Sequence, residues 1–342
     1  MNDGFGDLFM STGQVNVTFR MPTKGTQLPK WKRQRMEHQQ YRLVGNHSAV
    51  KICYWCKKSM KDEGHCYKFD FYGIDSEKCL EMSPAITCNQ RCKHCWRDTS
   101  VFSKDWVGPV DDPKDIVDGC LSGRTNLMIG FKGNDKVKPE MFEDAVVPNH
   151  AAISLTGEPC MYPLLPELVQ EFFNRNFKTV FLVTSGTVPS CLEKFKTMTP
   201  PTNIYLSLEA TNKEQYKTLC VPVIDNAWEK VNESIDILRE LKGRCRRVIR
   251  ITLMKGLNMD DMEGFAKLIE RVDPDVVETK GYMFMGYSRK RLEQENSPSH
   301  DEVKAFAEKL AARIGFDITD EVAKSTICML TRPGYAEDYP NP

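Results

Sequence analysis

The feature that most constrains the fold of this chain is a regular alternation of short apolar runs with stretches of helical periodicity. Each apolar run has the length of a strand, ends in a polar or glycine-rich motif, and precedes a stretch long enough for a helix. Five runs are clear: 151–156, 179–184, 204–208, 248–254 and 276–283. A sixth strand leads into Cys88. Six such units predict an α/β fold, a partial (βα)6 TIM-like barrel, with its chemistry at the carboxyl ends of the strands.

Three cysteines stand close together after the first of these strands. Cys88, Cys92 and Cys95 form a C-x3-C-x2-C run with polar, loop-forming residues between them. Three thiolates so close in sequence converge only where the backbone wraps around a group that they all bind. A structural zinc site normally has four ligands, often in C-x2-C pairs, and this spacing fits that pattern poorly. A [4Fe–4S] cubane held by three thiolates leaves one iron open. Free or zinc-binding cysteines are the alternative.

A second group of cysteines precedes the first strand. Cys53, Cys66 and Cys79 are spaced thirteen residues apart, and Cys56 stands three residues after Cys53. The segment between them is rich in aromatic residues. An irregular zinc knuckle and a second iron–sulfur cluster with three widely spaced ligands both fit this pattern.

The composition excludes several classes of protein. The 342 residues carry 47 Lys/Arg and 47 Asp/Glu, so any binding of nucleic acid depends on local basic patches. Thirteen cysteines occur without a secretory signal or the pattern of a small secreted scaffold. No apolar run reaches the roughly 18 residues of a membrane span. We therefore expect a cytoplasmic protein without membrane association.

Four segments are expected along the chain. Residues 1–48 are basic and weakly structured, and are either a phosphate-binding arm or a solvated surface. Residues 49–80 are the cysteine-rich segment with the second group of cysteines. Residues 81–315 form the barrel, including a last helix with Ser299 as its N-cap. Residues 316–342 form a C-terminal tail.

Several motifs together resemble one family of radical S-adenosylmethionine (SAM) enzymes. The cysteine run matches the radical SAM signature, with His94 in its usually aromatic position. The whole set, in order, resembles the tRNA wybutosine-synthesising enzymes, the 4-demethylwyosine synthases. The matching stretches are GHCYKFDFYGI (64–74), C-x8-C-x3-C-x2-C-W-R (79–97), SLTGEP (154–159), FLVTSGT (181–187), YLSLEATN (205–212), IRITLMKGLN (249–258) and VETKGYMFMGYS (277–288). The flavodoxin-like domain of eukaryotic members is absent, as in the stand-alone archaeal form.

The resemblance implies two [4Fe–4S] clusters and a radical reaction. The C-x3-C-x2-C cysteines would hold the cluster that chelates SAM, whose cleavage gives a 5′-deoxyadenosyl radical. That radical would abstract hydrogen from the methyl group of N1-methylguanosine at position 37 of tRNA-Phe. Cys53, Cys66 and Cys79 would hold a second cluster that binds pyruvate, with Cys56 as a bystander. Lys68 would form a Schiff base with pyruvate, whose remaining carbons complete the tricyclic 4-demethylwyosine (imG-14).

The resemblance also implies the wider setting of the reaction. The enzyme would be a carbon–carbon lyase of wybutosine biosynthesis, a monomer, with an external electron donor of flavodoxin or ferredoxin type. Two alternatives are kept. One is another radical SAM enzyme such as a glycyl-radical activase, and the other is a non-catalytic, zinc-dependent RNA-binding protein.

Polar residues at the ends of three strands are candidates for contact with SAM. They are Gly157, Glu158, Ser185, Ser207 and Glu209. A glutamate in a tight turn after a strand can accept hydrogen bonds from the ammonium group of SAM, and the serines could contact its carboxylate or ribose. At two positions the chain departs from the family, because Ser185 replaces a frequent asparagine and Glu209 a more usual aspartate.

Basic residues at and after the last strand are further candidates for the site. Strand alternation places Lys280 at the barrel mouth, although a buried, paired lysine is an equal alternative. Arg289, Lys290 and Arg291 could contact the phosphates of the anticodon stem, or form a solvated surface. The other cysteines are expected to be inert and buried: Cys120, Cys160, Cys191, Cys220, Cys245 and Cys328.

Overall fold

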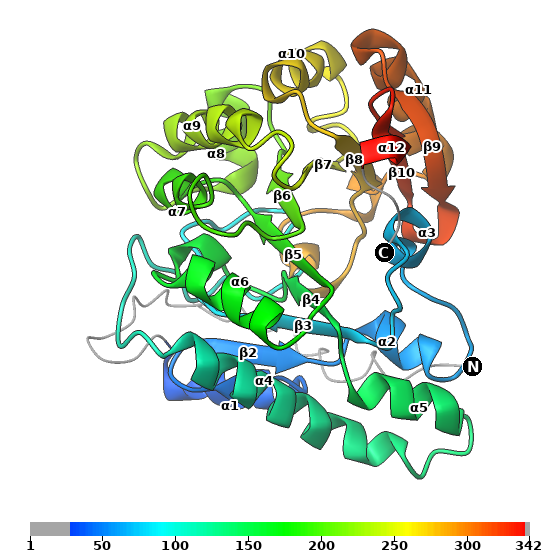
Figure 1. Cartoon of the computed structure of the whole chain (residues 1–342). Coiled ribbons are helices and arrows are strands. Elements are labelled where there is room, and N and C mark those ends of the chain that lie inside the picture. Colours follow the sequence, from blue (N-terminus) through cyan, green and yellow to red (C-terminus); the bar gives the residue numbers. More distant parts are fainter. Residues whose placement is uncertain (1–27, 339–342) are drawn as a thin grey trace.

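The computed structural model describes residues 28–338, which are built around one sheet of ten strands. The order across the sheet is β1-β2-β3-β4-β5-β6-β7-β8-β10-β9. The strands are β1 (Arg42–Val44), β2 (Ser48–Lys51), β3 (Cys79–Ser83), β4 (His150–Ile153), β5 (Thr179–Thr184), β6 (Asn203–Ser207), β7 (Arg246–Leu253), β8 (Val276–Gly281), β9 (Asp317–Val322) and β10 (Ile327–Thr331). Helices cover the outer face of this sheet (Figure 1).

The six central strands, β3 to β8, run parallel and neighbour one another in chain order. Each is joined to the next by at least one helix, so the predicted partial (βα)6 barrel is confirmed. The predicted run 179–184 coincides with β5. The predicted run 151–156 extends beyond the observed strand, because β4 ends at Ile153 and the chain then turns toward the segment that leads into Cys88.

The outer helices are amphipathic and bury their apolar sides on the sheet. They are α4 (Pro113–Met128), α5 (Pro139–Val146), α6 (Leu165–Asn174), α7 (Pro189–Lys194), α8 (Lys213–Cys220), α9 (Ala227–Glu240), α10 (Met262–Val272) and α11 (His300–Ile314). The predicted N-cap of α11 is confirmed: the Ser299 hydroxyl accepts from the amide of Glu302 at 3.2 Å. None of the helices in residues 28–338 is long and apolar enough to cross a lipid bilayer.

One short helix lies on the inner side of the barrel. The helix α3 (Tyr67–Tyr72) follows α2 (Tyr54–Ser59), and it ends at Gly73 in the left-handed conformation. Tyr67, Phe71 and Tyr72 of α3 form a core cluster with inward residues of the parallel strands. This part of the cysteine-rich segment therefore lies in the barrel interior, whereas Cys56 and Met60 pack with Met128 of α4 and Ala145 of α5.

Both edges of the sheet contain segments that the sequence did not predict there. The antiparallel pair β1–β2 adjoins β3, and α1 (Lys30–His38) precedes it, so the expectation of weak structure does not hold for residues 30–48. Residues 1–27 lie outside the described part. At the other edge, β10 pairs antiparallel with β8 and β9 pairs with β10, so residues 317–331 are no tail. The run Ile327–Thr331 is fully buried. The last element is α12 (Tyr335–Asp338).

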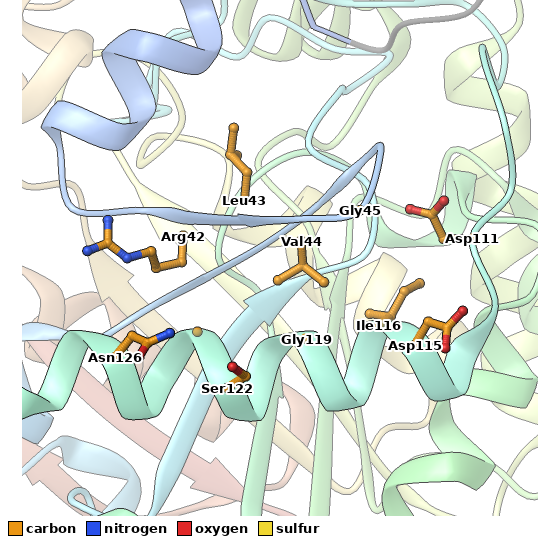
Figure 2. Close-up of a pocket in the computed structure, with 11 residues that line it drawn as sticks. Arg42, Leu43, Val44, Gly45, Asp111, Asp115, Ile116, Gly119, Ser122 and Asn126 are labelled. Carbon is orange, nitrogen blue, oxygen red and sulfur yellow. The ribbon is translucent and has the colours of Figure 1, made fainter.

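A surface pocket of about 470 Å³ lies between β1 and α4 (Figure 2). The close packing of these elements depends on Gly119, where a Cβ atom would overlap Cγ1 of Val44. The pocket residues include Asp111 and Asp115 but none of the cysteines. The pocket is therefore separate from the residues to which the sequence assigns chemistry.

Candidate active site

The C-x3-C-x2-C cysteines lie between β3 and α4, at the carboxyl end of the barrel, in a segment that we call the cluster loop (residues 88–98). The loop is held by backbone hydrogen bonds to the last turn of α8 and to the segment that follows it. The amide of Lys93 donates to the carbonyl of Leu219 at 2.8 Å, and the amide of Val223 donates to that of Asn89 at 2.9 Å. The protein backbone thus fixes the loop on both sides.

Arg291 holds the cluster loop from the opposite direction. Its guanidinium donates to the backbone carbonyls of Lys93, at 3.2 Å, and of Cys95. The predicted contact of Arg291 with RNA phosphates therefore does not fit, because these donors are already used inside the protein. Arg289 and Lys290, in the 3-10 helix η3 (Gly286–Lys290), are exposed.

The thirteen cysteines, all free thiols, divide into two classes by exposure. The partly exposed ones are Cys53, Cys66, Cys79, Cys88, Cys92 and Cys95. The buried ones are Cys56, Cys120, Cys160, Cys191, Cys220, Cys245 and Cys328. The first class consists of the six predicted ligands. A thiol that binds a group outside the packed core has to reach the edge of that core, so this division agrees with the predicted roles.

The second group of cysteines gathers around the inner helix. Cys53 and Cys66 are the N-caps of α2 and α3, and Cys79 begins β3. Burial raises the pKa of Cys79 to about 12, and the charges of Lys68 and Cys66 also act on it. Burial likewise raises the pKa of Cys53, with a contribution from Cys79. The pKa of Cys79 thus responds to Cys66, and that of Cys53 responds to Cys79, which agrees with three thiols that lie near one another.

Neither group of cysteines is as compact as a site for one metal ion. Among the described residues, the group of three potential ligand atoms all within 4.8 Å of one another is that of His300, Glu321 and Cys328. Sulfurs bound to one zinc ion at about 2.3 Å would lie about 3.8 Å apart. A cubane offers each thiolate a different iron and so suits wider spacing. The cysteines therefore fit a [4Fe–4S] group better than zinc.

Cys56 is held by a buried arginine that the sequence did not single out. The thiol of Cys56 lies 3.8 Å from Nη2 of Arg124 and 3.6 Å from the carbonyl oxygen of Glu77. Arg124, on α4, also donates to the carbonyls of Glu77, of Cys79 at 2.7 Å and of Ala145 at 3.0 Å. Cys56 is thus engaged in the wall of the site, as a bystander would be.

The turn after β4 packs directly against the chain that enters the cluster loop. Gly157 has φ of +74°, and a Cβ atom there would overlap the carbonyl oxygen of Ala85 and lie 2.6 Å from that of Thr87. The next amide, of Glu158, donates to the same Thr87 carbonyl at 2.9 Å. Only glycine allows this approach.

The Glu158 carboxylate joins the ends of β4 and β5. One oxygen accepts from the amide of Cys160 at 3.0 Å and from the Thr184 hydroxyl at 2.6 Å. The other accepts from the amide and the hydroxyl of Ser185, at 2.8 and 2.6 Å. All its acceptor positions are filled by protein donors, so a contact with the ammonium of SAM requires one donor to leave.

Ser185 is the donor that can leave most easily. Its hydroxyl also lies 2.9 Å from the Thr187 hydroxyl, which in turn donates to the Asn89 side chain of the cluster loop at 2.9 Å. The end of β5 is therefore connected to the cluster loop by a chain of hydrogen bonds.

Glu209 and Ser207 occupy the end of β6. Glu209 is buried, and burial raises the pKa of its carboxyl to about 7. The Thr252 hydroxyl donates to it at 3.3 Å, and Nε2 of His94 lies 3.6 Å away. Burial lowers the pKa of His94 to about 4. Ser207 is partly exposed, two residues earlier on the same side of the strand.

Lys68 lies in the first turn of α3 and extends into the barrel. Its Nζ atom is 4.4 Å from the ring centroid of Phe181, on β5, and 5.6 Å from that of Tyr205, on β6. Its charge also acts on Cys66. Its sequence neighbour Phe69 is 44% exposed, so the rings beside the amine come from the strands.

A buried polar network that the sequence analysis missed anchors α3. Arg250, on β7, pairs with Glu278, on β8, at 2.6 Å. The hydroxyls of Tyr72 and Tyr205 donate to Glu278 at 2.6 and 2.9 Å, and Arg250 donates to the hydroxyl of Tyr67. In the sequence, Arg250 and Glu278 are each a charged residue inside an apolar run, and each stands two residues before another polar residue, Thr252 or Lys280.

Lys280, two residues after Glu278, is a half-buried lysine with a protein partner. Its Nζ donates to the carbonyl of Ser325 at 2.7 Å, and burial lowers its pKa to about 8, with Arg250 contributing. Lys280 is thus only partly buried, and its partner is a backbone carbonyl, so its contacts agree better with a paired lysine than with an amine that is free at the barrel mouth.

Glu81 and Arg97 connect the two groups of cysteines, and neither was singled out from the sequence. Arg97 pairs with Glu81 at 3.4 Å. Loss of solvent and the charge of Glu81 both raise the pKa of the partly exposed Cys53, whereas burial raises that of Cys95 to about 11 against the charge of Arg97. One ion pair thus faces both groups.

Comparison with known proteins agrees with this geometry. The family model described as Radical SAM superfamily matches residues 82–269, and the one described as Wyosine base formation matches residues 271–332. The S-adenosyl-L-methionine-dependent tRNA 4-demethylwyosine synthase of Pyrococcus abyssi is 44% identical over 298 residues, 86% of each chain. That of Pyrococcus horikoshii is 43% identical and covers 89% of this chain and 90% of its own.

Two solved structures are similar over nearly the whole chain. One, described as TYW1 with a lysine-pyruvate adduct bound, has a TM-score of 0.80 and 32% identity and covers 90% of this chain and 97% of its own. Archaeal TYW1 has a TM-score of 0.73 and 30% identity, with 89% and 96% covered.

The fold and the cluster loop define a radical SAM enzyme, which uses a [4Fe–4S] cluster and SAM. Within that class, the chain belongs to the tRNA 4-demethylwyosine synthase family.

Proposed function

We propose that this chain converts N1-methylguanosine at position 37 of tRNA-Phe into 4-demethylwyosine with carbons from pyruvate, as a carbon–carbon lyase of wybutosine biosynthesis. The observation that carries the proposal is the place of Lys68 inside the barrel, where its Nζ atom lies 4.4 Å from the ring centroid of Phe181 and its charge acts on the thiols of Cys66 and Cys79. A similar solved structure holds a lysine-pyruvate adduct. A glycyl-radical activase has no need of such a lysine.

Cys88, Cys92 and Cys95 hold the cluster that binds SAM. When bound, the cluster and SAM supply a 5′-deoxyadenosyl radical after transfer of one electron. Glu158 accepts hydrogen bonds from the ammonium of SAM once the Ser185 hydroxyl turns to Thr187, its second partner at 2.9 Å. Ser207 and Glu209 lie nearby at the end of β6, and Gly157 lets the turn reach the loop.

Cys53, Cys66 and Cys79 hold a second [4Fe–4S] cluster, with Lys68 at its edge. The neutral amine of Lys68 attacks the keto carbon of pyruvate, a C=N bond forms, and the keto oxygen leaves as water. The imine fixes that carbon for a short-lived radical partner. The rings of Phe181 and Tyr205 lie beside the amine, at 4.4 and 5.6 Å from their centroids. A monomeric state, a cytoplasmic location and a flavodoxin or ferredoxin as donor stay predictions.

Borohydride trapping tests the pyruvate site. Incubation of the reconstituted protein with pyruvate and borohydride should leave a mass adduct on the peptide that contains Lys68. Lys68→Ala should lose the adduct and the tricyclic product, yet still cleave SAM. Lys280→Ala is the control, because its amine is also in the barrel but is bonded to Ser325. An adduct absent from wild type, together with normal product formation by Lys68→Ala, would refute the proposal.

A further inference from the structure

The surface around the cluster loop is strongly basic in a chain without net charge. Three segments, 28–42, 91–104 and 283–292, contain twelve Lys/Arg and two acidic residues. The whole chain contains 47 of each sign, so the rest has an excess of ten acidic residues. We call these three segments the basic face.

Ion pairs and a backbone hydrogen bond join the three segments into one surface. Asp98 in the cluster loop forms ion pairs with Lys32 at 2.8 Å and with Arg35 at 3.0 Å, both on α1. On the other side, the amide of Tyr287 donates to the carbonyl of Trp96 at 3.0 Å. The side chains of Asp98 and Lys32 are only 8% and 7% exposed, so this pair is a buried anchor of α1 on the cluster loop. Arg291 is bonded to the same loop, and the other ten basic residues supply the charge of the basic face.

Two exposed indoles lie on the same surface. Trp31 is 39% and Trp96 is 45% exposed. The guanidinium of Arg35 lies 5.0 Å from the Trp31 ring centroid, and that of Arg97 lies 3.5 Å from the Trp96 ring centroid. An exposed ring backed by a guanidinium is a surface on which unpaired nucleobases stack.

We propose that the basic face docks the anticodon arm of the substrate tRNA, with α1 against its phosphates and Trp96 against a base of its loop. The proposal rests on the proposed function. Trp96 directly follows Cys95, so a base stacked on it lies next to the site where the radical forms. A nucleotide of the anticodon loop has to leave the stack of its neighbours to enter such a site, and an aromatic ring can replace the lost stacking.

RNA is favoured over an acidic electron-donor protein as the occupant. Phosphate contacts need positive charge spread along a surface, which α1 extends beyond the cluster loop. An electron-donor protein has to approach only the first cluster, and it has no need of the Trp31 indole on α1. The two occupants predict different losses, so one set of variants distinguishes them.

The sharpest variant is Asp98→Asn, which removes a negative charge. Asparagine keeps the oxygen that accepts from the Ser100 amide at 2.9 Å, but loses the charge that holds Lys32 and Arg35. If net charge alone governed binding, affinity for methylated tRNA-Phe would rise. If α1 must be held in place, affinity falls. Anisotropy with labelled tRNA measures the difference, with iron content as the check of an intact cluster loop.

A second pair of variants tests the charges and the ring. Lys30→Gln with Arg289→Gln should weaken binding and reduce the slope of log affinity against log salt by about one to two. Lys267→Gln with Lys309→Gln removes the same charge from exposed positions on α10 and α11, at the opposite side from α1 (Figure 1), and should change neither. Trp96→Ala should weaken binding by about tenfold or more without changing the slope.

Three outcomes are decisive. Unchanged tRNA affinity in both Asp98→Asn and Trp96→Ala overturns the docking face, even if wild type makes the tricyclic base. Unchanged tRNA affinity together with slower reduction of the cluster by flavodoxin would assign the basic face to the electron donor, and this result also overturns the proposal of tRNA docking. Weakened affinity as predicted, in a wild type that makes no tricyclic base, supports the docking face while the proposed function fails.

Discussion

The guanidinium of Arg291 donates a hydrogen bond to the backbone carbonyl of Cys95, 196 residues earlier in the chain. Arg291 follows β8, the last parallel strand, and the cluster loop follows β3, the first one. The two ends of the barrel are thus joined at the cluster loop. The two segments also pack closely at Gly286, where a Cβ atom would overlap the backbone carbonyl oxygen of Trp96. The cluster loop therefore depends on the region matched by the wyosine model.

Arg291→Gln should therefore lower the iron content of the first cluster and the cleavage of SAM, because two backbone carbonyls lose their donor. Arg289→Gln removes the same charge two residues earlier from an exposed side chain, and should keep both. Iron analysis and 5′-deoxyadenosine formation without RNA measure the effect. Equal values for the two variants would mean that Arg291 acts only as a surface charge.

The two classes of cysteine predict opposite results of substitution. Cys88→Ala, Cys92→Ala and Cys95→Ala should each abolish SAM cleavage. Cys53→Ser should lose about four irons while SAM is still cleaved. Cys56→Ser should keep iron and turnover, because its thiol faces Arg124. A loss of about four irons from the Cys56 variant would contradict the assignment of ligands.

Gly157 and Gly256 provide a matched pair for the turn after β4. Both have positive φ, +74° and +71°, so alanine at either carries a similar backbone strain of roughly 1 to 2 kcal/mol. A Cβ atom at Gly157 meets the Ala85 carbonyl, whereas at Gly256 it meets nothing within 4 Å. Gly157→Ala should lower the free energy of unfolding further than Gly256→Ala and impair SAM cleavage. Similar losses in denaturant titrations would show that the close approach has no energetic weight.

Lys280 predicts a pH-dependent stability. Its pKa is about 8 in the folded protein and 10.5 in the unfolded chain, so between these values the unfolded state binds more protons and stability rises with pH. Over this window the group contributes a change of about 3 kcal/mol. The difference in unfolding free energy between wild type and Lys280→Met, measured without clusters from pH 7 to 11, should therefore change in favour of wild type. A constant difference would mean that Lys280 is not held in a dry site.

The barrel was predictable from sequence because its strands are buried on both faces and read as apolar runs. The six proposed ligands could be singled out from sequence because their spacing matches a family motif, and they are the cysteines that lie partly exposed. The strands at the edge of the sheet could not be predicted in the same way. β9 alternates exposed and half-buried residues, and β10 is a short apolar run that only its pairing with β8 identifies as a strand.

The partners of the site residues were also out of reach. Glu158 is in the predicted turn, but nothing in the sequence shows that Ser185 and Thr184 fill its oxygens. Likewise, Arg250 and Glu278 meet only because β7 and β8 are neighbours in register. Such pairings join residues from distant segments, and one sequence carries no signal for them beyond an unexpected charge in an apolar run.

The most direct test of the account is a labelled reaction. The anaerobic protein is incubated with SAM, reductant, methylated tRNA-Phe and pyruvate carrying carbon-13 at a single position, and the nucleosides are analysed by mass spectrometry. The account predicts 4-demethylwyosine that carries label from C2 or C3 of pyruvate and none from C1, and no such product from Lys68→Ala. A tRNA that keeps its N1-methylguanosine while SAM is cleaved, or a product without pyruvate label, would contradict it.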